Sequence, residues 1–221
     1  TLQITFDKIE SRHIVKVLRK KEGDAIYITN GKGQVFNCKI TIANDKKCLV
    51  SILSKEEKKQ FKDYYLHVAI APTKNNDRLE WFIEKATEIG IDEITPIICQ
   101  NSERKIIKKE RLEKIIVAAM KQSLKFYLPK LNEAVSFSEF LKKKQKGNIY
   151  IAHCEESEKK YLKSVVKPKD SVTILVGPEG DFTVTEISES IAKNHIPITL
   201  GITRLRTETA ALVAVQNISF I

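Results

Sequence analysis

Two short loops near the C-terminal end of the sequence carry the residues that could do chemistry. The residues G-P-E-G occupy 177–180, directly after the apolar run 172–176, and L-R-T-E-T-A occupies 205–210, shortly after Leu200-Gly201. Each loop joins an expected strand to an expected helix, which is where open α/β sheets bind ligands. The two loops together therefore predict one ligand site.

The first of these loops is expected to be stiff and to expose its amides. Gly177 and Gly180 permit backbone conformations that are closed to other residues, and Pro178 between them fixes one dihedral. Such a loop could wrap a flat ligand. Thr183 and Glu186 have the spacing of a capping box, which predicts that the next helix begins there.

The second loop brings a positive charge to the site. Thr207 is a suitable N-cap for a helix that runs towards Phe220, and Arg206 would then lie directly before the N-terminus of this helix. A guanidinium group is therefore expected beside both loops.

Hydrophobic periodicity predicts the elements that position these loops. The first sixty or so residues alternate like a small β domain, and a charged stretch at 55–62 is expected to be a linker. After it, strand and helix alternate, which predicts an α/β domain with a parallel sheet. In the first part we expect a helix at 10–18 and strands at 27–29, 34–42 and 47–53; in the second, strands at 65–71, 94–99, 149–153, 172–176 and 196–200 and helices at 77–89, 108–123, 183–194 and 207–220.

The expected helix at 77–89 carries both an apolar stripe and charges. Leu79, Phe82, Ile83, Ala86 and Ile89 recur at helical spacing and predict a face that packs in the core, with Asn76 as cap and Gly90 as terminator. Lys74 and Arg78 lie in or beside the preceding loop, where they could reach a phosphate. The alternative is that both are ordinary surface cations.

Composition limits the classes of function. A formal net charge of +10 favours a polyanionic partner such as RNA, although lysine runs are also typical of solvated helix faces. The four cysteines have no metal-ligand spacing, so no metal site is expected. The dinucleotide and P-loop glycine motifs are absent. Without a signal peptide or a long apolar span, the sequence predicts a soluble cytoplasmic protein and no membrane contact.

The motifs resemble those of one known family. G-P-E-G at 177–180 followed by L-G-x-x-x-L-R-T-E-T-A at 200–210 is similar to the signature of the ribosomal RNA small subunit methyltransferase E family, within the knotted SPOUT methyltransferases. H-I-V-K-V-L-R at 13–19, the segment 74–90 and Gln122-Ser123 before Pro129 also match the family's pattern. The resemblance spans almost the whole chain.

The resemblance implies a fold and an activity. It implies an α/β fold with a SPOUT-type parallel sheet and a C-terminal trefoil knot at residues 63–221, preceded by a small PUA-like β-barrel RNA-binding domain at residues 1–62. The implied activity is methyl transfer from S-adenosylmethionine to N3 of a uridine in 16S ribosomal RNA of the small subunit. A homodimer is implied as well. Because the chain begins at Thr1, we also expect that a short N-terminal piece of the barrel precedes it.

The resemblance also implies roles for particular residues. Removing the N3 proton leaves charge on O2 and O4 of the uracil, and Arg206 is the first candidate to stabilise it. Glu208 is either the proton acceptor or a carboxylate that stabilises its helix through the macrodipole. The expected cofactor-binding residues are Leu175, Gly177, Pro178, Glu179, Gly180, Leu200, Gly201 and Leu205, and the expected RNA-binding residues are His13, Arg19, Lys74, Arg78, Arg104 and Lys125.

Three departures from the family's pattern bear on polar contacts to cofactor or RNA. Asp181 stands where a third glycine is usual, Thr203 where a basic residue is common, and Leu124-Lys125 where Gly-Arg is frequent. Two alternatives remain open at this point. One is a different SPOUT enzyme, such as a ribose 2′-O-methyltransferase, and the other is a non-catalytic RNA-binding assembly factor.

Overall fold

The computed structural model describes residues 2–221 and divides into two compact units. Unit 1 comprises the chain up to Phe61 together with Lys125–Tyr127, and unit 2 comprises Lys62–Leu124 and Leu128–Ile221. The short return to unit 1 is fixed by hydrogen bonds, because the Gly33 amide donates to the Phe126 carbonyl at 2.8 Å and the Tyr127 hydroxyl donates to the Lys58 carbonyl at 2.9 Å.

Unit 1 is a four-stranded antiparallel sheet in the order β1-β4-β3-β2, with one helical segment on its apolar face. Its strands are β1 (Gln3–Thr5), β2 (Ala25–Thr29), β3 (Gln34–Ile42) and β4 (Leu49–Glu57). The helix expected at 10–18 is α1 (Lys8–Arg12), which continues as a π-helical segment, His13–Val17. It begins earlier than expected because the Asp7 side chain accepts the Glu10 amide.

The charged stretch expected to be a linker begins as part of a strand. β4 continues to Glu57 and pairs with β3, so that Val35 lies opposite Glu56 and Gln34 lies opposite Glu57. The expectation of a linker at 55–57 was wrong. Strands pair through main-chain groups, so exposed charged side chains do not prevent pairing, and here they also give no alternating pattern that would predict a strand.

Unit 2 is built on a parallel sheet, as the alternation of elements predicted. Its main path is β10-β12-β9-β11-β5-β6-β7, and β8 pairs with β6 beside it. All of these pairings are parallel. The strands are β5 (Tyr65–Ile70), β6 (Glu93–Ile98), β7 (Lys130–Leu131), β8 (Val135–Ser136), β9 (Asn148–Ala152), β10 (Lys160–Tyr161), β11 (Ser171–Val176) and β12 (Ile196–Thr199).

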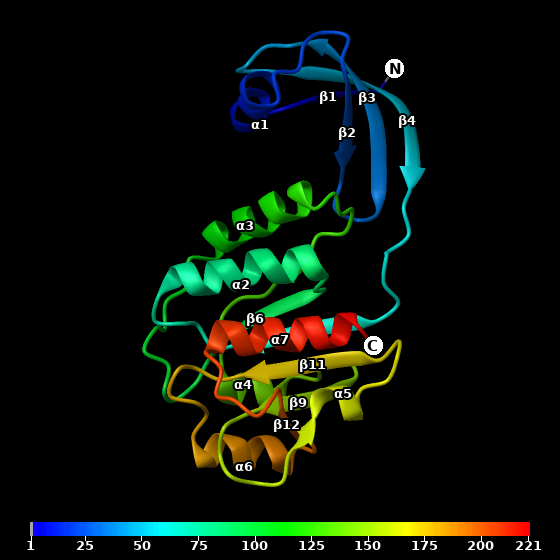
Figure 1. Cartoon of the computed structure of the whole chain (residues 1–221). Helices are drawn as coiled ribbons and strands as arrows, with labels where there is room; N and C mark the ends of the chain where they lie inside the picture. Colours follow the sequence, from blue (N-terminus) through cyan, green and yellow to red (C-terminus); the bar gives the residue numbers. More distant parts are fainter. Residues whose placement is uncertain (1) are drawn as a thin grey trace. The chain divides into compact units, whose positions relative to one another are not determined.

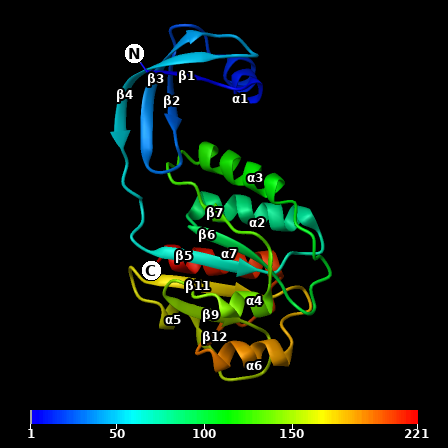
Figure 2. The ribbon, with the colours of Figure 1, turned by 180° about the vertical axis from the view of Figure 1, so that it is seen from behind.

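Helices cover both faces of this sheet (Figures 1 and 2). Alternate residues of β5 divide between two cores: Leu66, Val68 and Ile70 face one, and Ala69 faces the other. The first core contains α2 (Asn76–Ile89), α3 (Lys109–Gln122), α5 (Leu162–Val165) and α7 (Thr207–Ser219), and the second contains α4 (Phe137–Lys142) and α6 (Val184–Ala192). The sequence had indicated α2, α3, α6 and α7 but not the short α4 and α5.

Helix α2 confirms the predicted apolar stripe and corrects its cap. Leu79, Phe82, Ile83 and Ala86 are at most 1% exposed. The N-cap is Asn75 rather than Asn76, because the Asn75 side chain accepts the Asp77 amide at 2.9 Å. Gly90 ends the helix at φ 136°, as expected. Within residues 2–221, no helix has the length and apolar character needed to cross a membrane.

Candidate cofactor site and RNA-binding residues

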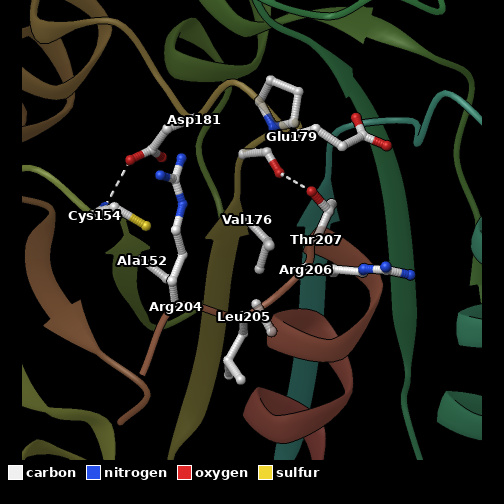
Figure 3. Close-up of a pocket in the computed structure, with 12 residues that line it drawn as sticks. Ala152, Cys154, Val176, Glu179, Asp181, Arg204, Leu205, Arg206 and Thr207 are labelled. Carbon is white, nitrogen blue, oxygen red and sulfur yellow. Dashed lines mark hydrogen bonds between the residues drawn. The ribbon is translucent and has the colours of Figure 1, made fainter. Parts of the chain in front are cut away.

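A pocket lies where the two loops meet, at the carboxyl ends of β9 and β11 and in front of α7 (Figure 3). This is the edge at which parallel sheets bind ligands. The pocket encloses about 350 Å³, which lies within the ~300–1,000 Å³ typical of small-molecule sites. Its lining consists of Ala152, Cys154, Val176, Gly177, Pro178, Glu179, Asp181, Arg204, Leu205, Arg206, Thr207 and Ala210.

The structure brings only part of the predicted cofactor set to this pocket. Of the predicted residues, Gly177, Pro178, Glu179, Leu205 and the catalytic candidate Arg206 line it. The others, Leu175, Gly180, Leu200, Gly201 and Glu208, do not.

Among the predicted cofactor residues that do not line the pocket, Leu175 has the clearest physical reason. It is 0% exposed and packs in the core beneath α4 and α6. Alternation along β11 explains this, because its neighbour Val176 faces the pocket and successive strand side chains point to opposite faces.

The glycines of the first loop do not have the conformation that the sequence suggested. Gly177 and Gly180 are not among the residues with positive φ, and the left-handed position in this loop belongs to Asp181, at φ 61°. Close approach accounts for both glycines: a Cβ on Gly177 would lie 3.0 Å from the Phe182 ring, and one on Gly180 would lie 3.2 Å from the Asn101 Cβ.

Side chains from neighbouring segments hold this loop in place. The Glu179 carboxylate accepts the Lys74 amide at 2.9 Å. The Asn101 side chain donates to the carbonyls of Gly180 and Asp181, at 3.0 and 3.1 Å. The loop is therefore fixed by groups from the carboxyl ends of β5 and β6.

The capping box at the start of α6 is confirmed. The Thr183 hydroxyl accepts the Glu186 amide at 3.2 Å, and the Glu186 carboxylate accepts the Thr183 amide at 2.9 Å. Glu186 is also buried and accepts the Gln100 amide at 2.9 Å, so the same side chain ties α6 to the end of β6.

Helix α7 begins differently from the prediction. Arg206 rather than Thr207 is the N-cap residue, and its side chain makes no capping hydrogen bond. Thr207 is the first helical residue, and its hydroxyl donates to the Gly177 carbonyl at 3.0 Å. The two loops predicted to act together are thus joined directly.

Arg206 and Glu208 occupy different environments. Arg206 is exposed, and none of the hydrogen bonds and ion pairs among residues 2–221 involves its guanidinium group. Glu208 is only 6% exposed. Its Oε1 lies 3.7 Å from Nε of Arg78, and its Oε2 is buried with no hydrogen-bond partner in the described part of the chain.

The predicted RNA-binding residues of unit 2 are partly engaged within the protein. The Lys74 ammonium pairs with Glu103 at 2.9 Å, although both side chains are more than half exposed. Arg104 donates from Nε and Nη2 to the Lys74 carbonyl at 3.2 and 2.8 Å. Arg104 therefore also clamps the loop that carries Lys74.

In unit 1, His13 and Arg19 are both exposed: His13 is the first residue of the π-helical segment, and Arg19 follows its C-cap, Leu18, with φ 53°. The Lys125 ammonium lies 3.6 Å from the centroid of the Phe61 ring, a cation–π contact.

The sequence missed several residues of the pocket, among them Cys154, Asp181 and Arg204. Cys154 follows an apolar strand without any loop motif, so nothing local marks it. Asp181 was noted as a departure from the family's pattern, as was Thr203, but Arg204 was not, and the pocket that Asp181 and Arg204 share was not predicted. No group of three or more His, Cys, Asp or Glu side chains that could hold a metal ion occurs in residues 2–221.

Comparison with known proteins agrees with this geometry. The RNA methyltransferase domain family matches residues 45–219, and the RNA methyltransferase PUA domain family matches residues 6–53. Ribosomal RNA small subunit methyltransferase E of Rickettsia conorii is 35% identical over 93% of this chain and 85% of its own length. The chain belongs to this methyltransferase E family. The relative from Bacillus subtilis is 30% identical over the whole chain and 90% of its own length.

Solved structures of similar proteins carry the same fold. A probable rRNA-methyltransferase from Porphyromonas gingivalis has a TM-score of 0.90 at 38% identity, covering 96% of this chain and 90% of its own. A ribosomal RNA small subunit methyltransferase E from Neisseria gonorrhoeae, bound to S-adenosyl methionine, has a TM-score of 0.86 at 25% identity, covering 99% of this chain and 92% of its own. The family resemblance, the α/β class and the PUA-like domain are thereby confirmed, and the trefoil knot stays a prediction.

Proposed function

We propose that this chain transfers a methyl group from S-adenosylmethionine to N3 of a uridine in 16S ribosomal RNA. The observation that carries the proposal is the pocket formed by the two loops, at the carboxyl ends of β9 and β11. Its lining includes the apolar side chains of Val176, Leu205 and Ala210, which suit a purine, and side chains of both signs of charge. The cofactor combines these features, because it has an adenine ring and a zwitterionic amino-acid end.

The cofactor supplies a methyl group on a sulfonium, and the protein must prepare the nucleophile. The exposed guanidinium of Arg206 lies at the N-terminus of α7 and would stabilise the charge that spreads onto O2 and O4 when uracil loses its N3 proton. Glu208 is the candidate proton acceptor because its Oε2 has no hydrogen-bond partner within residues 2–221, although it lies buried outside the pocket lining. Of the remaining predicted cofactor residues, Gly180, Leu200 and Gly201 lie in or beside the two loops, and Leu175 packs in the core with α4 and α6.

The partner is the RNA of the small ribosomal subunit. We assign RNA binding to the domain at 1–62, with His13 and Arg19, and methyl transfer to residues 63–221, with Lys74, Arg78, Arg104 and Lys125 as further phosphate contacts. The chain would work as a cytoplasmic homodimer. Trp81 on α2 is 42% exposed and Phe220 at the end of α7 is 83% exposed, and these neighbouring helices offer an apolar surface for a second copy.

Two cation substitutions test the RNA contacts in unit 2. Lys74→Ala and Arg78→Ala should each weaken RNA binding and reduce the slope of log K against log salt by about 1, because each removes one phosphate contact. Binding of a 16S RNA fragment at several salt concentrations measures this slope. Lys85→Ala is the matched control, since its ammonium is held by Glu84 and Glu88 on α2. Slopes that equal the wild-type value would contradict the assignment.

The activity itself is tested by methyl transfer from labelled S-adenosylmethionine to unmodified small subunits and to naked 16S RNA, followed by nucleoside mass spectrometry. We expect 3-methyluridine from subunits. A 2′-O-methyl nucleoside would instead identify a ribose methyltransferase. No product despite intact cofactor binding would identify an RNA-binding assembly factor.

A further inference from the structure

One side of the pocket carries two opposite charges that the family signature does not include. Asp181 lies at the end of the first loop and Arg204 lies in the segment before α7, and both line the pocket beside Cys154. Figure 3 shows the Arg204 side chain extending along the pocket wall towards Asp181 and Cys154. Both charges also act on the Cys154 thiol: Asp181 raises its pKa and Arg204 lowers it, although burial is the largest influence and raises it.

Asp181 is held firmly in this position. Its Oδ2 accepts the Cys154 amide at 2.6 Å, and its Oδ1 accepts the Phe182 amide at 2.8 Å. These bonds offset the strain of a left-handed backbone at φ 61° in a residue other than glycine. The carboxylate therefore connects the first loop to the end of β9 by a hydrogen bond and places a negative charge at the pocket wall.

Arg204 is the complementary group and has spare hydrogen-bonding capacity. Its side chain is exposed in the pocket, and across residues 2–221 its guanidinium takes part in no hydrogen bond or ion pair, including none with Asp181. A guanidinium group presents a planar fork of donors that matches a carboxylate. The other arginine that lines the pocket, Arg206, is the N-cap residue of α7, and Figure 3 shows its side chain extending away from Arg204.

We propose that Arg204 binds the carboxylate of the cofactor's methionyl end, with Asp181 beside it as the partner of the ammonium. This inference rests on the proposed function and deepens it, because it assigns one end of the ligand to one wall of the pocket. The adjacent opposite charges match a zwitterionic α-amino acid. Arg204 is then a specificity residue for ligands that carry the amino-acid end, and it leaves Arg206 for the RNA.

The test compares two ligands that differ in that end. S-adenosylhomocysteine carries the zwitterion, and 5′-methylthioadenosine has the same nucleoside without it. Calorimetric titration of the full chain should show that Arg204→Ala weakens S-adenosylhomocysteine binding by about tenfold, the low end for a hydrogen bond to a charged group. Binding of 5′-methylthioadenosine should stay within about twofold, because its contacts are to the apolar lining residues.

Two further variants sharpen the comparison. Arg204→Lys should recover part of the lost affinity, because it keeps the charge without the planar fork. Arg111→Ala is the matched control, because Arg111 on α3 pairs with Glu80 and does not line the pocket, so the affinity for both ligands should stay as in the wild type.

The inference is overturned if Arg204→Ala weakens both ligands by the same factor, which would mean a general effect on the pocket, or if it weakens neither. A wild-type chain that binds neither ligand would overturn the proposed cofactor as well. The two failures are therefore distinguishable.

Discussion

Arg206→Ala should lower the rate of methyl transfer by about a hundredfold to a thousandfold, while the affinity for S-adenosylhomocysteine stays within about threefold. The reason is that Arg206 lines the pocket with its side chain extending away from Arg204 and Asp181, and its guanidinium would act on the charge that develops on the uracil rather than on the cofactor. The side chain makes no capping hydrogen bond, so its removal should not destabilise α7. Single-turnover methylation of small subunits and calorimetric cofactor binding measure the two effects separately.

Arg206→Lys is the control for this prediction. It keeps a positive charge but loses the planar fork, so we expect a rate between those of the wild type and the alanine variant. A large loss of cofactor affinity in Arg206→Ala, with a rate that recovers at saturating cofactor, would instead make Arg206 a cofactor-binding residue.

Gly147→Ala should lower the free energy of unfolding of unit 2 by more than ~3 kcal/mol. Gly147 precedes β9 at φ 73°, and a Cβ there would lie 1.8 Å from the carbonyl oxygen of Ser171 at the start of β11. That contact is with main chain, so only a shift of one strand could relieve it. The shift would disturb the pairing of Asn148 with Val172. Urea unfolding, followed through the fluorescence of Trp81, the single tryptophan, reports on this unit.

Gly201→Ala is the matched substitution in the same unit. Gly201 also has a positive φ, at 158°, but a Cβ there would meet no atom of residues 2–221 within 4 Å. The expected cost is about 1 kcal/mol, from backbone strain alone. Equal losses of stability in the two variants would contradict the prediction, because they would show that the close contact with Ser171 is not the reason for a glycine at position 147.

The sequence predicted the elements of unit 2 well where a local pattern was strong. The stripe of α2 and the apolar runs of β5 and β11 each contain enough residues to define a period, and their ends fell within one residue or two of the structure. Short elements were missed. Helix α5 spans Leu162–Val165, a single turn, and such a segment is too short to show helical periodicity.

The loops were identified correctly, but the reasons for some of their residues were not. Gly177 was expected to supply an unusual φ, and the structure instead requires it for the approach of the Phe182 ring. Thr207 was expected to cap its own helix, and it donates to Gly177 instead. In both cases the prediction used a rule for neighbouring residues in sequence, whereas a contact between two segments determines the role of the residue.

The sequence by itself determined the family, the order of the longer strands and helices, the positive charge and the two loops that carry the site. Local periodicity and motif spacing encode these features. Only the tertiary structure decided which side chains meet in the pocket. The bonds from Cys154 to Asp181 and from Thr207 to Gly177 join residues 27 and 30 positions apart. They exist because the parallel sheet places β9 beside β11 and brings the start of α7 to the same edge, and this strand order is set by packing across the whole unit.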